Sequence, residues 1–493
     1  MEKYLLEITV FICWAVIMIF ELIGARILWP YLWTSIFVWT SLIWIILWSL
    51  SIWYYLGWKI ADKKANLEFL SKIVFLWAIF ILLTIVIKNI LLIFITTRIN
   101  DIKIWSIIAS IILFLPTSIV MWMVSPYVAK LKIEKLSNSG TTIWNLYAIS
   151  TTWSIIWTFL SGFFLIPFFW TNTLLIILSI TLLSLSIFIY NKKYLISKFV
   201  ILLLIVIIYL SLNEIKGINK FKGFIDIDTA YSKVWIYDSI QKDTKLKTRN
   251  LLINNEHSSA MFLDNNELVY EYTKYYNLAR HFNPQFKKTL MFWWAWYSFP
   301  KSFLLNYPNS SIDVIEIDPK LTELAKNYFS LKDNKNLNIY HEDWRVYLNK
   351  TKEKYDVIFW DAFSSHYSIP YQLTTKEAIQ KTYDILNNDW VVILNTISAI
   401  EWEAWLFLQA EYKTYKSIFP QVYIFPVRNK NDWNEVQNII LVALKSDKKP
   451  EFYSSDLTLN SYLDHLWKKE IISNLPILTD DYAPVDYYIN KTI

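Results

Sequence analysis

The first 212 residues consist mainly of long apolar runs separated by short polar stretches, whereas the apolar runs in the rest of the chain are short. A run of about 20 apolar residues is long enough to cross a bilayer as a helix. Six such runs lie at residues 5–28, 35–58, 69–97, 104–125, 143–169 and 171–190, and a shorter one lies at 199–212. We therefore predict a multi-pass α-helical membrane domain over residues 1–212.

Positive charge in this first part predicts a topology. Lysines cluster after the second, fourth and sixth apolar runs. Cytoplasmic loops of membrane proteins carry an excess of Lys and Arg, so we expect these loops and the N-terminus on the cytoplasmic side of a cell membrane. The run at 199–212 is short for a span. We accordingly expect the soluble part in the cytosol, whereas a seventh full span would place it outside the cell.

The first apolar run contains two charged residues, Glu21 and Arg26. It is therefore expected to be a retained span and not a cleaved signal peptide. Charges inside a bilayer are costly and are usually paired or functional. Because the two residues are five positions apart near a helix end, we favour a structural pair, or snorkelling to the interface, over a functional site.

The polar second part changes its periodicity at residue 288. Before it, alternating segments such as 233–238 and 247–253 predict antiparallel strands, and we assign residues 213–287 to a small β-rich domain. After it, short apolar runs alternate with amphipathic helical stretches; the runs are residues 289–292, 312–317, 337–341, 355–360 and 390–395. This alternation predicts a parallel, doubly wound sheet of the Rossmann-like α/β class over residues 288–493.

The charge distribution argues against a nucleic-acid site, and the cysteine and histidine residues argue against a metal site. The net charge is +6, but the positive excess belongs to the apolar part and is explained by topology, so we expect no nucleic-acid partner. Cys13 is the single cysteine, which excludes a disulfide framework or a thiolate metal site. The 5 histidines show no metal-ligand spacing, and we expect no bound metal.

Glycine is scarce, and tryptophan takes the share that glycine normally has. The chain contains 6 Gly and 26 Trp, and residues 224–493 contain no glycine, against an average glycine usage of about 7%. A nucleotide-binding domain needs glycine most in the turn after its first core strand. Here that segment, Met291–Tyr297, reads M-F-W-W-A-W-Y. We hypothesise that a codon decoded as glycine in the source has been translated as tryptophan.

A truly Trp-rich membrane protein is the alternative, because Trp favours bilayer interfaces. That alternative accounts for some of the Trp residues in the apolar part. It does not account for Trp344, Trp360 or Trp390 in the polar part.

Acidic residues follow three consecutive predicted strands. Glu316, Asp343 and Asp361 each stand where an apolar run stops. Ligands of such sheets bind outside the carboxyl ends of the strands, where an acid accepts hydrogen bonds from ribose hydroxyls. Glu316 is placed to hold a ribose and Asp343 to accept from an adenine amino group. A solvated carboxylate at a strand end is a common alternative for Glu316 taken alone, but acids at three consecutive strand ends argue against coincidence.

Together, these motifs resemble the polyamine aminopropyltransferase (spermidine synthase) family, specifically its membrane-fused members. The matching segments are Trp293–Trp296, Ile315–Asp318, Asp343–Trp344, Tyr355–Asp361 and Leu478–Val485 in the polar part, and Gly24–Arg26, Val38–Ser41 and Tyr55–Asp62 in the apolar part. Reading tryptophan as glycine sharpens the match, because the turn becomes G-G-A-G and Asp343-Trp344 becomes D-G. The resemblance covers nearly the full chain.

The resemblance implies transfer of an aminopropyl group from decarboxylated S-adenosylmethionine to a polyamine-type acceptor, with release of methylthioadenosine. The nucleoside is then a co-substrate, and no permanently bound cofactor is expected. Asp361 matches the general base of the family. The nucleoside-site positions are Trp293, Trp294, Trp296, Glu316, Asp318, Asp343 and Trp344, and the amine-site positions are Tyr270, Glu271 and Ser364. Besides the amine, we expect membrane lipid and a second copy of the chain as partners.

Two departures from the family remove negative charge from the amine pocket. The second acid of the family's D-x-x-D is Ser364 here, and the acid of the glycine turn is missing, with Trp296 or Tyr297 in its place. A site for a di- or tricationic amine needs such charge, so we expect an acceptor other than putrescine. Glu271 and His366 are candidates to compensate, although an ordinary loop histidine is the simpler interpretation of His366.

Two other functions stay open on the sequence alone. An S-adenosylmethionine-dependent methyltransferase shares the fold and the ribose acid, and would consume the non-decarboxylated cofactor. A non-catalytic membrane protein with a nucleoside-sensing domain gains support if the indoles of Trp293, Trp294 and Trp296 are real, because positive φ is costly for such residues.

The recoding hypothesis predicts the mass of one peptide. In protein isolated from its source, the segment Thr289–Lys301 should be lighter than the printed sequence by the mass of an indole side chain at each recoded position. Peptide mass spectrometry measures this directly. A peptide with the full mass of three tryptophans would contradict the hypothesis.

Overall fold

The computed structural model separates into two compact units. One comprises residues 1–222 with 230–233, and the other comprises residues 223–229 with 234–493. The first unit holds the apolar helices, and the second holds nearly all of two β-sheets. The structure describes residues 5–32, 35–63, 66–98, 101–132, 139–190, 196–201, 203–204, 207, 211, 223–241, 244–254, 256–293, 297–361, 369–401, 405–432 and 434–489.

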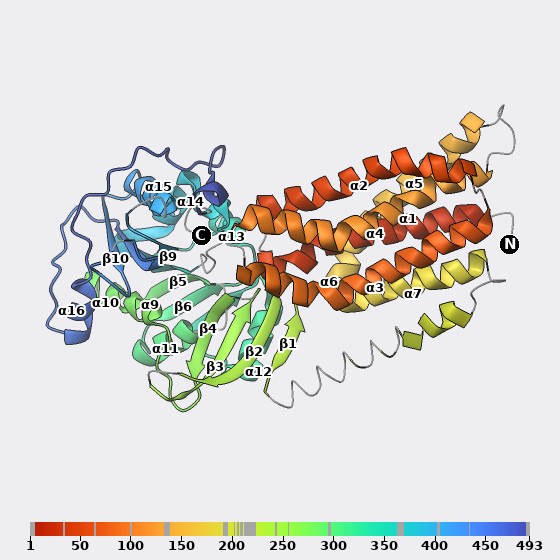
Figure 1. Cartoon of the computed structure of the whole chain (residues 1–493). Helices are drawn as coiled ribbons and strands as arrows, with labels where there is room; N and C mark the ends of the chain where they lie inside the picture. Colours follow the sequence, from red (N-terminus) through yellow and green to blue (C-terminus); the bar gives the residue numbers. More distant parts are fainter. Residues whose placement is uncertain are drawn as a thin grey trace. The chain divides into compact units, whose positions relative to one another are not determined.

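The first unit is a helical bundle, shown in red to yellow in Figure 1. Its helices are α1 (Leu5–Leu32), α2 (Ile36–Lys63), α3 (Leu67–Arg98), α4 (Ile102–Lys132), α5 (Ser139–Leu160), the π-helical turn η3 (Ser161–Leu165), α6 (Ile166–Phe168) and α7 (Thr171–Ile189). Within the described residues, 6 stretches are long and apolar enough to cross a membrane. This confirms the predicted helical fold of the first part. Most of the short run at 199–212 lies outside the described residues.

Close packing and one charged contact organise this bundle around α1. A Cβ at Gly24 would lie 3.2 Å from the side chains of Leu42 and Phe114, so glycine permits the close approach of α1 to α2 and α4. The Arg26 guanidinium donates through Nη1 to the backbone carbonyl of Ile166. The last carbonyls of a helix lack intrahelical donors, and this arginine satisfies one of them. Within the described part, Glu21 does not form the expected pair with Arg26.

The second unit begins with a small four-stranded sheet. Its order is β1 (Ile225–Asp228), β2 (Lys233–Ile240), β3 (Lys247–Ile253) and β4 (Glu256–Phe262). β2 pairs antiparallel with β3, and β3 pairs antiparallel with β4. The predicted strand at 247–253 has the observed bounds, and the predicted strand at 233–238 extends two residues further.

A seven-stranded mixed sheet forms the centre of the second unit. In spatial order it contains β10 (Gln421–Pro426), β11 (Gln437–Leu444), β9 (Leu386–Ser398), β8 (Tyr355–Asp361), β5 (Lys288–Trp293), β6 (Ser311–Ile315) and β7 (Leu337–Tyr340). The five strands from β9 to β7 are parallel, as predicted. The expectation of a wholly parallel sheet is wrong at one edge, where β11 runs antiparallel to both β9 and β10. A short connection without a crossover helix joins β10 to β11, and such a connection produces an antiparallel pair.

Helices cover both faces of this sheet, giving the predicted Rossmann-like α/β layers (Figure 1). The helical elements are α9 (Glu271–Lys274), η4 (Tyr275–Asn277), α10 (Leu278–Phe282), α11 (Ser298–Asn306), α12 (Pro319–Tyr328), α13 (Trp344–Lys350), η5 (Tyr371–Leu373), α14 (Lys376–Ile385), α15 (Leu406–Lys416), α16 (Leu457–Leu463) and α17 (Val485–Ile489). Side chains along β5 alternate between two cores, because successive strand residues face opposite sides. Leu290 and Phe292 share a core with α13, α14, α15 and α17, and Met291 shares the other with α10, α11, α12 and the small sheet.

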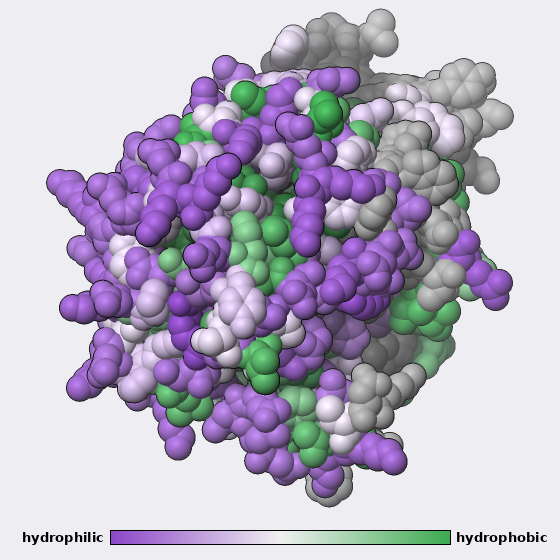
Figure 2. Space-filling view, turned by 90° about the vertical axis from the view of Figure 1, so that its left-hand side faces the viewer, coloured by the Kyte–Doolittle hydropathy of each residue, from purple (hydrophilic) through white to green (hydrophobic). Residues whose placement is uncertain are grey.

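Polar contacts of Asp480 tie the C-terminal segment to two of these helices. Its carboxylate pairs with the Arg345 guanidinium at 2.6 Å and accepts from the Thr375 hydroxyl at 2.6 Å. Its backbone N–H donates to Glu377 at 3.0 Å. The contacts of Asp480, which belongs to the segment Leu478–Val485, are thus structural. The face of the second unit in Figure 2 is mostly hydrophilic, with hydrophobic side chains near its middle, in keeping with two internal apolar cores.

Candidate functional site

Two acidic residues flank the carboxyl end of the central strand β5. Asp361 is the last residue of β8 and pairs in register with Trp293 of β5, while Glu316 follows β6 directly on the other side. Two inter-strand spacings therefore separate their backbones, or about 10 Å. Asp343 follows β7, the next strand along, as the N-cap of α13. The three acids lie at the carboxyl ends of the parallel strands, where ligands of open α/β sheets bind.

Asp361 is a buried carboxylate surrounded by hydrogen-bond donors. Its side chain is 4% exposed. The Tyr272 hydroxyl donates to Oδ2 at 3.2 Å, and the Asn395 amide donates to Oδ1 at 2.9 Å. The Tyr276 hydroxyl is near this carboxylate but makes no hydrogen bond with a described residue. Burial raises the pKa of Asp361 to about 6, because desolvation of the charged form outweighs donation from Asn395 and Tyr272. Such a group can exchange a proton near neutral pH.

Glu316 is more deeply buried than the other two acids and keeps one oxygen free. Its Oε1 accepts from the backbone N–H of Asp318 at 2.9 Å, but its buried Oε2 has no hydrogen-bond partner among the described residues. Desolvation raises the pKa of Glu316 well above its usual range, and the nearby Asp318 adds to the effect. A buried polar atom without a partner is costly. A ligand hydroxyl would satisfy Oε2.

Two of the predicted residues have a helix-capping contact in addition to any role at the site. Asp318 accepts from the backbone N–H of Lys320 at 2.9 Å at the start of α12. Asp343 accepts from the N–H of Val346 at 2.9 Å at the start of α13, which leaves its second oxygen for another donor. Between them, the buried Trp344 indole donates to the carbonyl of Ile315 at 2.9 Å.

The turn that connects β5 to α11 is described at its two ends. Trp293 ends β5, and Tyr297 is the N-cap of α11 with a left-handed φ of 59°. A positive φ is uncommon for a bulky residue and marks a strained position. The Tyr297 ring is fully buried, and its hydroxyl hydrogen-bonds to Thr322 Oγ1 at 2.6 Å. Trp294, Trp296 and Ser364, and His366 with them, lie outside the described residues.

The two predicted amine-site residues next to β4 are placed differently. Tyr270 is largely buried, its ring stacks on Tyr272 with centroids 6.0 Å apart, and its hydroxyl has no hydrogen-bond partner among the described residues. Tyr270 therefore contacts Tyr272, whose hydroxyl donates to Asp361. The side chain of Glu271 is 65% exposed and pairs with Lys274 at 2.5 Å. The structure therefore brings Tyr270, but not Glu271, to the group around Asp361.

Three residues of this group were not predicted from the sequence: Tyr272, Tyr276 and Asn395. A signal for Asn395 exists, since it is a polar residue where the apolar run 390–395 stops, as the three acids are in their own strands. Tyr272 and Tyr276 are four residues apart, one helical turn, so a helix there would place both on one side. Their position over Asp361 depends on how that helical segment packs on the sheet.

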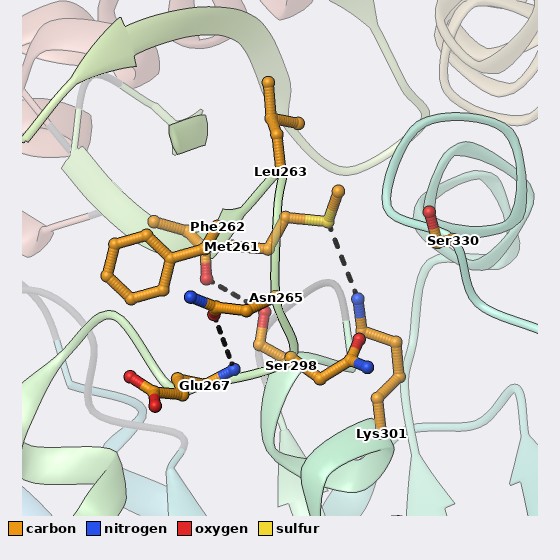
Figure 3. Close-up of a pocket in the computed structure, with 10 residues that line it drawn as sticks. Met261, Phe262, Leu263, Asn265, Glu267, Ser298, Lys301 and Ser330 are labelled. Atoms are coloured by element: carbon orange, nitrogen blue, oxygen red, sulfur yellow. Dashed lines mark hydrogen bonds between the residues drawn. The ribbon is translucent and has the colours of Figure 1, made fainter. Parts of the chain in front are cut away.

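A separate cavity lies beside α11 and does not include any of the three acids. Its volume is about 70 Å³, and it is bordered by the end of β4 with the loop that follows, by Ser298 and Lys301 of α11, and by Ser330 (Figure 3). The Lys301 ammonium contacts Met261 Sδ at 3.6 Å and donates to the carbonyl of Phe329. Burial lowers the pKa of Lys301 to about 8. The carbonyl contact, at the end of α12, is a typical helix C-cap interaction.

The raised pKa of Asp361 predicts that Asp361→Asn stabilises the fold as pH rises. A carboxyl whose folded pKa lies above its unfolded value costs stability progressively from about pH 4 to 6, because the charged form is disfavoured when buried. The neutral variant avoids that cost. We expect its advantage in the free energy of unfolding to grow over this pH range and level off above it, approaching about 3 kcal/mol.

Thermal unfolding of the full chain measures this advantage across the pH range. The exposed Asp389 provides a matched control as Asp389→Asn. A difference between wild type and Asp361→Asn that does not vary with pH would contradict the prediction.

Comparison with known proteins finds similarity over the part of the chain that contains the three acids. A protein-family model described as spermine/spermidine synthase domain matches residues 302–439. The chain is 31% identical over 170 residues to a polyamine aminopropyltransferase of Vibrio vulnificus, covering 34% of this chain and 54% of that protein. It is 27% identical over 172 residues to the eEF1A lysine and N-terminal methyltransferase of Xenopus laevis, covering 33% of this chain and 23% of that protein.

The chain is also similar to solved structures, at lower sequence identity. A crystal structure of a probable spermidine synthase from Corynebacterium glutamicum is 21% identical, with a TM-score of 0.41, and the match covers 48% of this chain and 84% of that one. The chain spans about half the length of the Vibrio relative. Residues 302–439, in the C-terminal part of the chain, are thus similar to the spermine/spermidine synthase domain.

Proposed function

We propose that the second unit transfers an aminopropyl group from decarboxylated S-adenosylmethionine to an amine. The observation that carries this proposal is the pair of buried acids on either side of β5. Glu316 has a free oxygen for a nucleoside hydroxyl, and Asp361 has a pKa of about 6 that suits proton transfer. Their separation of about 10 Å leaves room for a ribose at one acid and the reacting carbon near the other. The family match is the second support.

At the nucleoside end, Glu316 would accept hydrogen bonds from the ribose hydroxyls. Its Oε2 is buried and unpartnered among the described residues, so a hydroxyl donor relieves an existing cost. Asp343 would accept from the adenine amino group with the oxygen that does not cap α13. Asp318, Trp344 and the turn positions Trp293, Trp294 and Trp296 complete the proposed nucleoside site.

At the amine end, Asp361 would act as the general base. The amine must lose a proton to attack, because a protonated amine has no free electron pair. Its nitrogen forms a bond to the carbon next to the sulfonium, and the carbon–sulfur bond breaks with its electron pair going to sulfur. The products are the extended amine and methylthioadenosine, and the proton passes to Asp361. Tyr272 and Asn395 orient the carboxylate, and Tyr270 would border the amine.

The acceptor of this reaction is proposed to carry fewer charges than a polyamine. Among the described residues around Asp361 the neighbours are tyrosines and an asparagine, and Glu271 is paired with Lys274 in solvent. The sequence offers Ser364 at the position of the family's second acid. An ammonium group without a counter-charge in a low-dielectric site is disfavoured. A monoamine therefore suits this pocket better than putrescine.

The apolar helices are proposed to anchor the enzyme in a lipid bilayer, with its soluble unit in the cytosol. Length and composition of 6 helices support the anchoring. The lysine clusters after alternate runs support the orientation.

Release of methylthioadenosine tests the proposed reaction. The full chain in lipid, supplied with decarboxylated S-adenosylmethionine and a panel of mono- and diamines, should release this product with at least one amine. Asp361→Asn should slow release by about 10²–10⁴-fold. In the wild type kcat/KM should rise as pH increases through about 6, because the base must be ionised before it accepts a proton.

Asp389→Asn serves as the control and should leave the rate unchanged, because Asp389 is exposed and distant in register from the strand ends. Absence of release with every amine would overturn the proposal. Consumption of S-adenosylmethionine itself, with methyl transfer, would establish the methyltransferase alternative, which the partial match to a methyltransferase keeps in view.

A further inference from the structure

A line of polar side chains crosses the sheet beyond Asp361. The register pairs Trp360 of β8 with Leu394 of β9, so Asp361 and Asn395 are neighbours at the next position. β11 follows β9 in the sheet, with Asn438 paired to Ile397 and Asn395 paired to Ile440. Residues two apart on a strand share a face. Asn395 and Asn438 are therefore diagonal neighbours on the same face.

The hydrogen bonds along this line have one direction. The Asn438 amide donates to Asn395 Oδ1 at 3.0 Å, and the Asn395 amide donates to Asp361 Oδ1 at 2.9 Å. Asn395 is 1% exposed, so water does not compete for its two ends. An asparagine side chain has an accepting end and a donating end, and an ionised carboxylate only accepts. Donation from Asn438 thus keeps the NH₂ of Asn395 facing Asp361.

We propose that Asn438 is a positioning residue, which acts through Asn395 to hold the Asp361 carboxylate ionised and aimed for proton acceptance. This inference rests on the proposed function for its catalytic consequence, but the coupling itself is a property of the folded chain. Without a donor at position 438, the buried amide is free to turn its oxygen toward Asp361. That orientation accepts a hydrogen bond from the protonated acid and favours the form that cannot act as a base.

Few groups other than Asn395 affect the titration of Asp361 within the described residues. There, the titratable side chains that face it are Tyr272 of α9 and Tyr276 of η4. Burial raises the pKa of both hydroxyls well above the ordinary value, so both stay neutral over the range in which Asp361 titrates. The neutral Tyr272 hydroxyl donates equally across this range. A change in the titration of Asp361 on altering Asn438 is therefore attributable to the amide of Asn395.

Two variants of nearly equal size separate donation from packing. Asn438→Leu removes the donor, and Asn438→Asp replaces it with an acceptor that draws the NH₂ of Asn395 away from Asp361. The readout is the midpoint of the titration of Asp361 in the folded chain. It is taken as the pH at which the stability advantage of Asp361→Asn levels off, measured by thermal unfolding of the full chain with and without each variant. We expect the midpoint to rise from about 6 by about one pH unit in Asn438→Leu. In Asn438→Asp it should rise further, since a second carboxylate lies nearby.

A merely structural role would lower the melting temperature at every pH and leave that midpoint unchanged, and this result would overturn the proposal. Asn438 is half-buried, so at least one variant should fold. The pH profile of methylthioadenosine release should shift by the same amount. If the wild type released no product while the unfolding midpoint moved, the proposed reaction would fail and the coupling would stand. Release of product with an unmoved midpoint would support the reaction and overturn the coupling.

Discussion

The polypeptide has three residues in which to turn from β5 into α11, and the residue after them already has a left-handed backbone. Tyr297 adopts a φ of 59° with its ring fully buried. That conformation is inexpensive only for glycine. A strand that ends beside Asp361 and Glu316 must leave the sheet without filling the space between them. A small side chain in this bend is thus the physical condition for a nucleoside site.

The hydrogen bonding of buried tryptophans elsewhere in the chain shows how well the printed residue suits each position. Buried indole N–H groups normally find an acceptor. Among the described residues several do not, namely Trp14, Trp29, Trp53, Trp77, Trp122, Trp157 and Trp360. Trp344 is different, since its indole donates to the carbonyl of Ile315. The hydrogen-bonding group of these seven indoles is therefore buried at a cost, whereas that of Trp344 is satisfied.

Burial sets the chemistry of the acids at the strand ends. Glu316 and Asp361 are both almost fully buried, and desolvation raises the pKa of each. The donors around Asp361 limit the rise to about 6. Glu316 has only backbone donors, and desolvation raises its pKa well above the usual range. The two carboxylates at the strand ends therefore differ in the groups that donate to them.

The amino-acid sequence predicted the helices and strands better than it predicted the direction of strand pairing or the contacts between side chains. The periodicity indicated the strand at 247–253, and strand ends identified the edge at which Glu316 and Asp361 lie. The antiparallel edge formed by β10 and β11 was missed, because an apolar run does not specify the direction of its pairing. Tyr272 and Asn395 were missed because their contacts with Asp361 depend on helix packing and inter-strand register. Trp294, Trp296 and Ser364 stay predictions.

Titration of methylthioadenosine into the full chain tests the central claim most directly. Two polypeptides are compared, one with glycine and one with tryptophan at positions 293, 294 and 296. The account predicts saturable binding to the glycine form, weakened by Glu316→Gln, and no binding to the tryptophan form. Absence of binding to both forms would contradict it, as would equal binding to the two.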